Sequence, residues 1–328
     1  MLVPGCATFA PRPSPPQEVP VPLLSGTGAR MTRVQEIRSS ASFGGTPGFW
    51  ASLWKFVVGE KESPVVRPYG LYADAAGRLA VADPGLGAVH LFDRRNAAYR
   101  TIYFRKDGKA SPIGITGDGA ESIWFSDSAA GVVMRYSTKS GDLRPFVVNL
   151  SRPTGIAFNR TNGLIYVAET GRHEVVGFDA AGKEQVRFGG RGTKPGTFNF
   201  PTDLCVDGEG RIVVTNALNA RIQVVAPDGS PVGSFGSPGD SPGYFSKPKG
   251  VAADRRGLLY VADALFDAVQ VFDRGGNLVF TFGRSGSAPG EFWMPTGLFV
   301  DGDGLIYVSD SYNRRIQIFR VDALEDEI

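Results

Sequence analysis

A short motif that opens with proline recurs six times along this chain, and its spacing constrains the fold more than any other feature. Each copy reads Pro-x-Gly, then Asp or Asn, then Gly, then an apolar run that ends in Asp, Glu or Asn, with Asp203 replacing the first glycine in the fourth copy. The opening prolines are separated by 44, 41, 48, 47 and 47 residues and are Pro68, Pro112, Pro153, Pro201, Pro248 and Pro295. A repeat of this length is typical of an array of small sheets.

The fifth copy shows what one repeat contains. The apolar run from Gly250 predicts a buried strand, and Asp254 to Gly257 predicts a tight turn, because Asp can bond its own backbone and Gly supplies positive φ. Further strands are predicted over 258–262, 269–272 and 278–282. Four short strands with tight turns form one antiparallel blade. Because a lone blade cannot bury both faces, six copies predict an all-β, six-bladed β-propeller.

The sixth copy lacks its fourth strand, since only nine residues follow Phe319. The segment 33–43 has strand character and ends in Phe-Gly, as other fourth strands do. We expect this N-terminal strand to pair with the last blade and close the ring. The propeller domain would then span 31–328, with the blades starting at about residue 67.

Two further motifs repeat in register with the prolines. They are Tyr-Val-x-Asp at 260–263 and Asn-Arg-Arg-Ile-Gln at 313–317. Together with Pro-x-Gly and Asp-x-x-Gly, they resemble the NHL-repeat family of six-bladed β-propellers over about residues 31–321. The resemblance implies the fold and is nearly silent on function, since such propellers serve binding and catalysis alike.

The charge balance disfavours a nucleic-acid partner. There are 35 Lys and Arg against 33 Asp and Glu, which gives a net charge of +2. Some members of the resembled family bind RNA through a basic face, and a nearly neutral chain gives no such electrostatic footprint. The sequence also lacks a run of 18 apolar residues, so no membrane-spanning helix is expected.

Residues 1–30 are predicted to lie outside the propeller as a signal remnant and a disordered tether. Leu2 to Cys6 resembles the end of a bacterial lipoprotein signal, and the Pro-rich stretch from Pro11 to Pro22 predicts an extended, unpacked segment. We therefore expect lipidation at Cys6 and an extracytoplasmic position on the bacterial membrane, held by the lipid alone. The alternative is a cytoplasmic protein that starts at Met1 and carries an unmodified Cys6.

A short helix is predicted over about 48–58, because Phe49, Trp50, Leu53 and Trp54 follow helical spacing. We expect this helix to cap one end of the ring. The alternative is that it presents an aromatic face to a membrane or a partner.

Residues that repeat in every blade are predicted to serve the blade rather than a ligand. The acids that end the second strands should accept backbone N–H bonds, with a cation site as the alternative, and they are Asp83, Asp127, Glu169, Asp263 and Asp310. His90 and His173 fall in different blades and off the innermost strands, so zinc catalysis is disfavoured. No catalytic constellation or metal site is visible, and we do not expect an enzyme.

Unrepeated residues at one mouth of the ring are the better candidates for function. This face gathers the starts of the innermost strands and the loops after the second strands. The candidates are Tyr69, Thr154, Thr202, Lys249, Thr296, Arg172, His173, Phe266, Tyr312 and Arg314. We predict a module that binds a protein, or else a glycan or small molecule, at the cell envelope without a cofactor. The alternatives are a calcium-type hydrolase or lyase with its site at the channel mouth, and an RNA-binding propeller.

Overall fold

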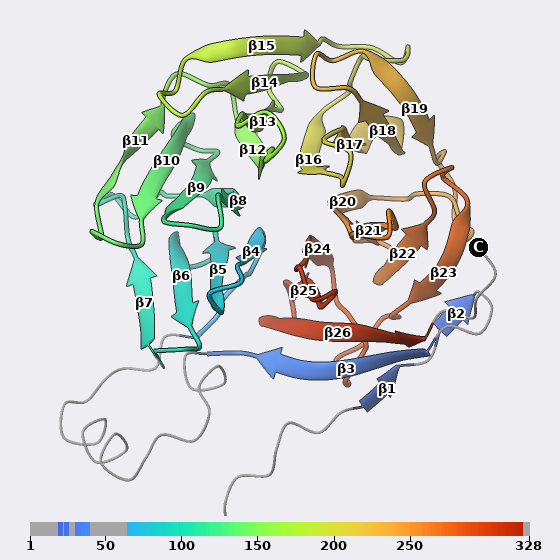
Figure 1. Cartoon of the computed structure of the whole chain (residues 1–328). Helices are drawn as coiled ribbons and strands as arrows, with labels where there is room; N and C mark the ends of the chain where they lie inside the picture. The colour runs from blue at the N-terminus through green and yellow to red at the C-terminus, as the bar shows by residue number, and fades with distance from the viewer. Residues whose placement is uncertain (1–18, 22, 26–29, 40–63, 97, 324–328) are drawn as a thin grey trace, which may run out of the picture.

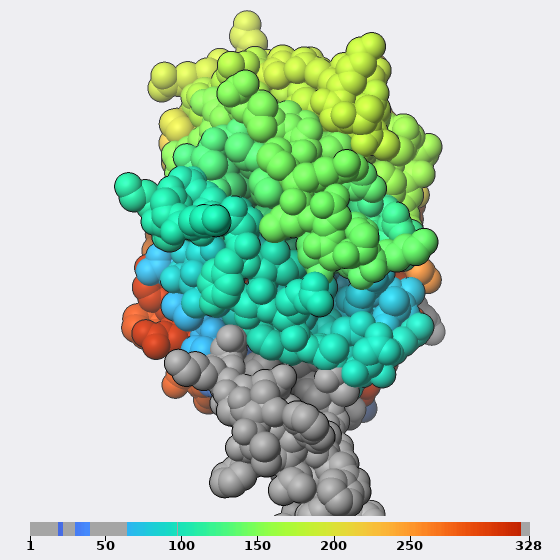
Figure 2. Space-filling view, turned by 90° about the vertical axis from the view of Figure 1, so that its left-hand side faces the viewer, coloured from blue at the N-terminus to red at the C-terminus, as the bar shows by residue number. Residues whose placement is uncertain are grey.

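The structure is a ring of six small antiparallel sheets (Figure 1). The computed structural model describes residues 19–21, 23–25, 30–39, 64–96 and 98–323. Each sheet runs from an innermost strand beside the central axis to an outermost strand at the rim (Figure 1). Seen edge-on from the side of the first blades, successive blades lie against one another (Figure 2). The predicted all-β, six-bladed propeller is confirmed.

The first four blades contain four strands each, and each blade follows the chain from the axis outward. In the first two blades the strands are β4 (Leu71–Ala73), β5 (Arg78–Asp83), β6 (Ala88–Asp93), β7 (Ala98–Ile102), β8 (Pro112–Gly117), β9 (Ser122–Asp127), β10 (Val132–Ser137) and β11 (Leu143–Val147). In the next two they are β12 (Pro153–Phe158), β13 (Ile165–Glu169), β14 (Glu174–Phe178), β15 (Glu184–Gly189), β16 (Pro201–Val206), β17 (Ile212–Asn216), β18 (Arg221–Val225) and β19 (Pro231–Phe235). A 3-10 turn, η1 (Ala217–Asn219), joins β17 to β18.

The last two blades each take strands from the N-terminal segment. The fifth blade contains β20 (Pro248–Ala253), β21 (Leu259–Asp263), β22 (Ala268–Phe272) and β23 (Leu278–Phe282), with β2 (Leu23–Ser25) added at its outer edge. The sixth blade contains β24 (Pro295–Val300), β25 (Ile306–Asp310), β26 (Arg315–Ala323), β3 (Arg30–Ile37) and β1 (Val19–Val21). Strand β3 pairs with β26, from Ile37 opposite Ile316 to Arg30 opposite Ala323.

This pairing confirms that an N-terminal strand closes the ring. The strand begins at Arg30, three residues before the predicted start at residue 33. Strands β1 and β2 also lie within the segment that the sequence predicted to be an unpacked tether. The predicted helix over 48–58, the end of the predicted strand at 40–43 and Cys6 lie outside the described residues. In the part of the chain that is described, no helix has the length and apolar character needed to cross a membrane.

The repeated polar residues hold each blade to the connector before it. Gln270 shows the pattern, since its Oε1 accepts from the N–H of Gly243 at 2.6 Å and its Nε2 donates to the carbonyl of Tyr244 at 2.8 Å. Gln223 and Gln317 make equivalent pairs of bonds in their own blades. One connector phenylalanine fills the space beneath each loop and is 0–1% exposed, namely Phe198, Phe245 and Phe292. The glycine-rich connectors before the last three blades therefore have a structural role.

The glycine of Pro-x-Gly marks the narrowest part of the ring. A Cβ on Gly70 would lie 2.3 Å from the carbonyl oxygen of Ile113 in the next blade, and one on Gly297 would lie 1.8 Å from that of Tyr69. Gly114, Gly155 and Gly250 meet the neighbouring backbone in the same way. Because real Cβ atoms do not approach backbone so closely, glycine is what allows the innermost strands to meet around the axis.

Candidate functional site

The face predicted to bind ligands contains several side chains that brace the ring instead. Thr154 and Thr296 are buried, and their hydroxyls lie 2.6 Å from those of Thr170 and Ser311. Thr170 and Ser311 in turn donate to the backbone carbonyl of the proline that opens the next blade, Pro201 and Pro68. These two predicted ligand residues therefore link one blade to the next.

Thr202 occupies the same position in the fourth blade but lacks this bond. Ala217 stands where the third and sixth blades have the partner hydroxyl, and the buried Oγ1 of Thr202 has no hydrogen-bond partner among the described residues. Lys249 is half-buried, and burial lowers the pKa of its ammonium group, with the charges of Lys247 and Arg152 acting in the same direction. Tyr69 is also half-buried, and the pKa of its hydroxyl is raised above its usual value mainly by burial.

The predicted loop residues have mixed environments. His173 is held by structure, because its Nδ1 accepts from the backbone N–H of Phe200 at 3.0 Å and its ring lies 4.5 Å from the Phe200 ring. Arg172 is exposed and pairs with Glu169 at 3.3 Å. Phe266 is half-buried and Arg314 is exposed.

Tyr312 is the most accessible aromatic residue among the predicted ones. It is 47% exposed, and its ring lies 5.5 Å from that of Trp293, which is 53% exposed. The guanidinium of Arg67 lies over the Tyr312 ring at 5.6 Å from its centroid. The face therefore offers an exposed aromatic pair beside a cation.

The recurring acids bind backbone rather than forming a ring of free carboxylates. Asp263 accepts from the N–H groups of Ser246 at 2.7 Å and Lys247 at 2.9 Å, both in the connector before the blade. Asp83 does the same for Val66 and Arg67. The prediction that these acids stabilise the blades is confirmed. No group of three or more His, Cys, Asp or Glu side chains suited to a metal occurs among the described residues.

The two histidines do not converge on the axis. His90 is fully buried on β6, where its Nε2 lies 3.2 Å from Asp83 and its Nδ1 lies 2.6 Å from the hydroxyl of Tyr99. His173 lies in the loop between β13 and β14. As predicted, they belong to different blades and cannot ligate one zinc ion together.

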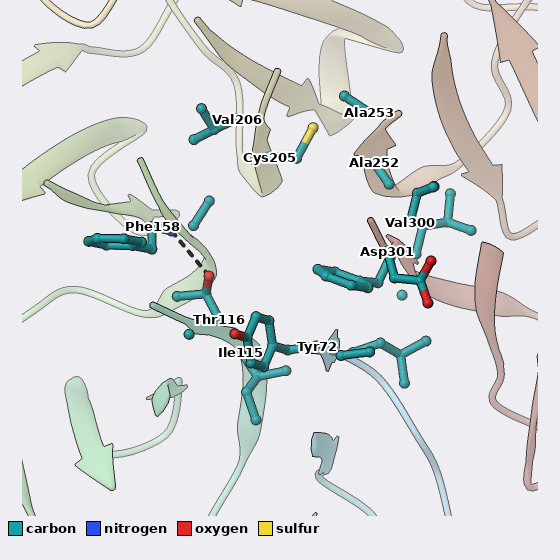
Figure 3. A pocket seen from close by; sticks show the side chains of 18 of the residues that line it. Tyr72, Ile115, Thr116, Phe158, Cys205, Val206, Ala252, Ala253, Val300 and Asp301 are labelled. Carbon is teal, nitrogen blue, oxygen red and sulfur yellow. Dashed lines mark hydrogen bonds between the residues drawn. The ribbon is translucent and has the colours of Figure 1, made fainter. Parts of the chain in front are cut away.

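A large cavity lies along the axis and opens on the opposite face from the one predicted to bind ligands. It is a cavity of about 630 Å³ lined by all six innermost strands and by the turns that follow them. It extends from the level of Tyr69 and Asp203 down to the turns that contain Asp74, Asp254 and Asp303. Figure 3 shows its walls, with Tyr72, Ile115, Phe158, Cys205, Val206, Ala253 and Val300 around a central space.

The open mouth of this cavity carries charges of both signs. Asp74, Asp207 and Asp254 pair with Arg78, Arg211 and Arg256, and these pairs hold the turns. Arg160 and Arg255 also line the cavity, and within the described chain neither pairs with a carboxylate. Each reaches toward a neighbouring turn, at Gly119 and Gly302 respectively. Two guanidinium groups are therefore available to a ligand at this mouth.

The inner end of the cavity carries one carboxylate. Asp203 replaces the glycine of the ring on β16, and its Oδ2 accepts from the N–H of Val251 on the next blade at 3.1 Å. Burial raises the pKa of Asp203 to about 7, although the N–H groups of Val251 and Leu204 act in the opposite direction. Cys205 lies two residues further along the same strand, and burial together with the Asp203 charge raises the pKa of its thiol.

Comparison with known proteins identifies NHL repeats in part of the chain. The NHL-repeat model matches residues 150–178, 198–225 and 292–319, which correspond to the third, fourth and sixth blades. This chain is a six-bladed β-propeller that contains NHL repeats. No curated protein matches the sequence significantly.

Solved structures share the propeller fold at low sequence identity. Virginiamycin B lyase from Staphylococcus aureus is 13% identical with a TM-score of 0.60, over 89% of this chain and 99% of that one. An auxiliary nutrient binding protein from Bacteroides thetaiotaomicron is 13% identical with a TM-score of 0.64, over 78% of this chain and 69% of that one. Hydrazine synthase from Kuenenia stuttgartiensis is 13% identical with a TM-score of 0.57, over 79% and 96%. These likenesses describe the fold alone, because NHL-type and related propellers host many functions.

One cavity residue stands out in the sequence. Asp203 is the one break in the Pro-x-Gly pattern of this propeller. Cys205 breaks no repeated pattern; in the structure it is partly exposed, packs against the core between the fourth and fifth blades, and lines the cavity. Arg160 and Arg255 also depart from the repeat, because the equivalent turn position in the other blades holds Ala or Gly, and this departure is the signal that could have found them.

Proposed function

We propose that this NHL propeller is a binding module whose primary ligand is a small molecule held in the axial cavity. The observation that carries the proposal is the cavity itself, whose volume of about 630 Å³ falls within the range of small-molecule sites. Its walls combine apolar and aromatic side chains with polar and charged groups that converge on it from several blades. Such a combination favours binding with a defined orientation.

The test is selective retention of small molecules from a deproteinised bacterial extract, measured by equilibrium dialysis and mass spectrometry. Ala253 lines the cavity, so Ala253→Phe should fill part of it and abolish retention. Val148→Phe is the matched control, because Val148 is 50% exposed and does not line the cavity. Compounds retained by the wild type and by V148F but not by A253F would support the proposal. Retention of nothing, or equal retention by A253F, would reject it.

A second candidate function is favoured by the exposed aromatic pair on the loop face. Trp293 and Tyr312 lie in contact and are both about half exposed, as is common where a protein partner docks. The double variant Trp293→Ser and Tyr312→Ser should then lose a partner captured from cell extract. Tyr103→Ser is the control, since Tyr103 is 61% exposed and follows β7, the outermost strand of the first blade. Equal capture by both variants would reject the loop face as the docking surface.

The envelope location is also a proposal and rests on the sequence around Cys6. Expression in a bacterium with labelled palmitate should mark the wild-type protein and leave Cys6→Ser unlabelled. The two alternative functions are tested separately. Stoichiometric calcium that survives washing with a chelator would support a metal-dependent hydrolase or lyase, and a shifted RNA band in a gel would support RNA binding.

A further inference from the structure

The inner end of the axial cavity breaks the symmetry of the ring at a single position. Five of the six blades have glycine at this level, and only the fourth blade has a side chain there, that of Asp203. A Cβ on the equivalent glycines would meet the next strand, at 2.2 Å for Gly250 and 2.3 Å for Gly114. In the fourth blade the Asp203 carboxylate occupies this junction and accepts from Val251 of the next blade. The ring therefore accommodates a carboxylate where packing elsewhere requires glycine.

This carboxylate forms no ion pair with another described residue, and its surroundings bear on what it could bind. The titratable groups around it are Tyr69 across the ring, Cys205 on its own strand, and Arg152 and Lys249 on the neighbouring blades. Asp203 raises the pKa of the Tyr69 hydroxyl, so the two groups lie close enough to interact. Neither Arg152 nor Lys249 perturbs Asp203, whose pKa shift arises from burial and two backbone N–H groups alone.

One aromatic side chain of the cavity wall interacts with Asp203. Tyr69 lines the cavity within the electrostatic reach of the Asp203 carboxylate, whereas Tyr72 and Phe299, whose rings lie 5.5 Å apart, line it nearer the mouth, where Tyr72 interacts with Arg160. A carboxylate beside an aromatic ring in a partly dry cavity favours an ammonium group, because the ring face and the carboxylate both attract positive charge.

Building on the proposed small-molecule site, we infer that the ligand carries a protonated amine, and that it binds with this amine directed inward to Asp203. Arg160 and Arg255 belong to the turns at the mouth, whereas Asp203 lies deeper, about 13 Å from the level of the turn at Asp207 by the rise of four residues along its own strand. These two cations at the mouth are compatible with a ligand whose outer end is anionic or neutral. The inner carboxylate is the feature that selects the ligand class.

Cys205 supplies a built-in reporter for this inference. Residues 203 and 205 point to the same face of a strand, and Cys205 lines the cavity. The chain has one other cysteine, so a Cys6→Ser background leaves Cys205 as the single thiol. Its thiolate attacks a methanethiosulfonate reagent, which forms a mixed disulfide and releases methanesulfinate. The rate can be compared between a cationic aminoethyl reagent, a neutral methyl reagent and an anionic sulfonatoethyl reagent.

The measured quantity is the ratio of the cationic to the neutral rate at about pH 8. Because both reagents attack the same thiolate, the ratio cancels any change in the pKa of Cys205. The ratio should fall by roughly tenfold in Asp203→Asn, as expected when one close charge is removed from a partly dry cavity. Asp303→Asn is the matched control, since Asp303 is an unpaired carboxylate at the mouth. This control should leave the ratio within about twofold of its value in the Cys6→Ser background.

The outcomes separate the inference from the proposed function. If the neutral reagent reacts readily but the ratio is unchanged in D203N, or falls equally in D303N, the amine inference is wrong while the cavity remains an accessible site. If the anionic reagent is preferred over the cationic one, the inference is also wrong. If the neutral reagent does not modify folded Cys205, the cavity is closed to small molecules, and both proposals are overturned. Urea unfolding of D203N confirms that the variant is folded in each assay.

Discussion

Arg315 should contribute more to stability than any other arginine in the repeats, because it links the two ends of the chain. Its side chain is 1% exposed, and its Nε donates to Asp310 at 2.6 Å. Its remaining nitrogens donate to Glu36 on β3 at 3.1 Å, and to the carbonyls of Ala288 and Glu291 at 3.0 and 2.9 Å. One guanidinium thus joins β26, the closing strand and the connector from the fifth blade.

The fourth blade offers a natural control for this residue. Arg221 stands at the equivalent position, but Asn216 replaces the aspartate, and no closing strand from the N-terminus is involved. Arg221 donates only to the carbonyls of Lys194 at 3.0 Å and Thr197 at 3.3 Å, and its Nε has no partner. The same Arg→Met change therefore removes ion pairs and two hydrogen bonds to carbonyls in the sixth blade, and only two hydrogen bonds to carbonyls in the fourth.

We predict that Arg315→Met lowers the free energy of unfolding by about 3–5 kcal/mol, the usual cost of removing one partner of a buried ion pair. Arg221→Met should cost about 1–2 kcal/mol, because it loses two hydrogen bonds to carbonyls and leaves no carboxylate unpaired. Against a typical domain stability of about 5–15 kcal/mol, the first change is large. Urea unfolding followed by tryptophan fluorescence and by circular dichroism measures both. Equal losses in the two variants, or a loss below about 1 kcal/mol for R315M, would refute the idea that this residue secures the closure.

Three further predictions follow from the ring and its cavity. Gly297→Ala should lower the free energy of unfolding by about 1–3 kcal/mol, because its Cβ would lie 1.8 Å from the carbonyl oxygen of Tyr69. Gly208→Ala is the control, since it has open space and should change this free energy by less than about 0.5 kcal/mol; the midpoints of urea unfolding compare the two variants. Ile37→Ala on the closing strand should cost about 2–4 kcal/mol in the same assay, because Ile37 is fully buried between the last and first blades, and a loss below about 1 kcal/mol would contradict that role. The wild type should lose stability as pH rises from about 4 to 7, because Asp203, with a raised pKa of about 7, keeps its proton in the folded state while the unfolded state releases it. Asp203→Asn lacks this titration and should become more stable relative to the wild type over the same range; a difference independent of pH would argue against a buried carboxyl.

Most of the architecture could be predicted because it depends on local and repeated signals. The six proline-led copies predicted the number of blades, and turn residues such as Asp254 and Gly257 predicted where one strand ends and the next begins. The missing fourth strand of the last copy required a strand from elsewhere, and the segment before the first copy was the available one. The boundary was imprecise because pairing with β26, rather than local propensity, decides where β3 begins.

The sequence by itself determined that the chain is an NHL propeller, that its two ends meet in one blade, and that the repeated acids serve the backbone. Only the tertiary structure shows at which face of the ring the axial cavity opens. Thr154 and Thr296 look like ligand residues in sequence, yet the close approach of neighbouring blades turns them into braces between strands. The same close approach at the glycine level ends the cavity and surrounds Asp203 with protein. The environment of that carboxylate depends on strands that lie far apart in sequence and meet only when the ring closes.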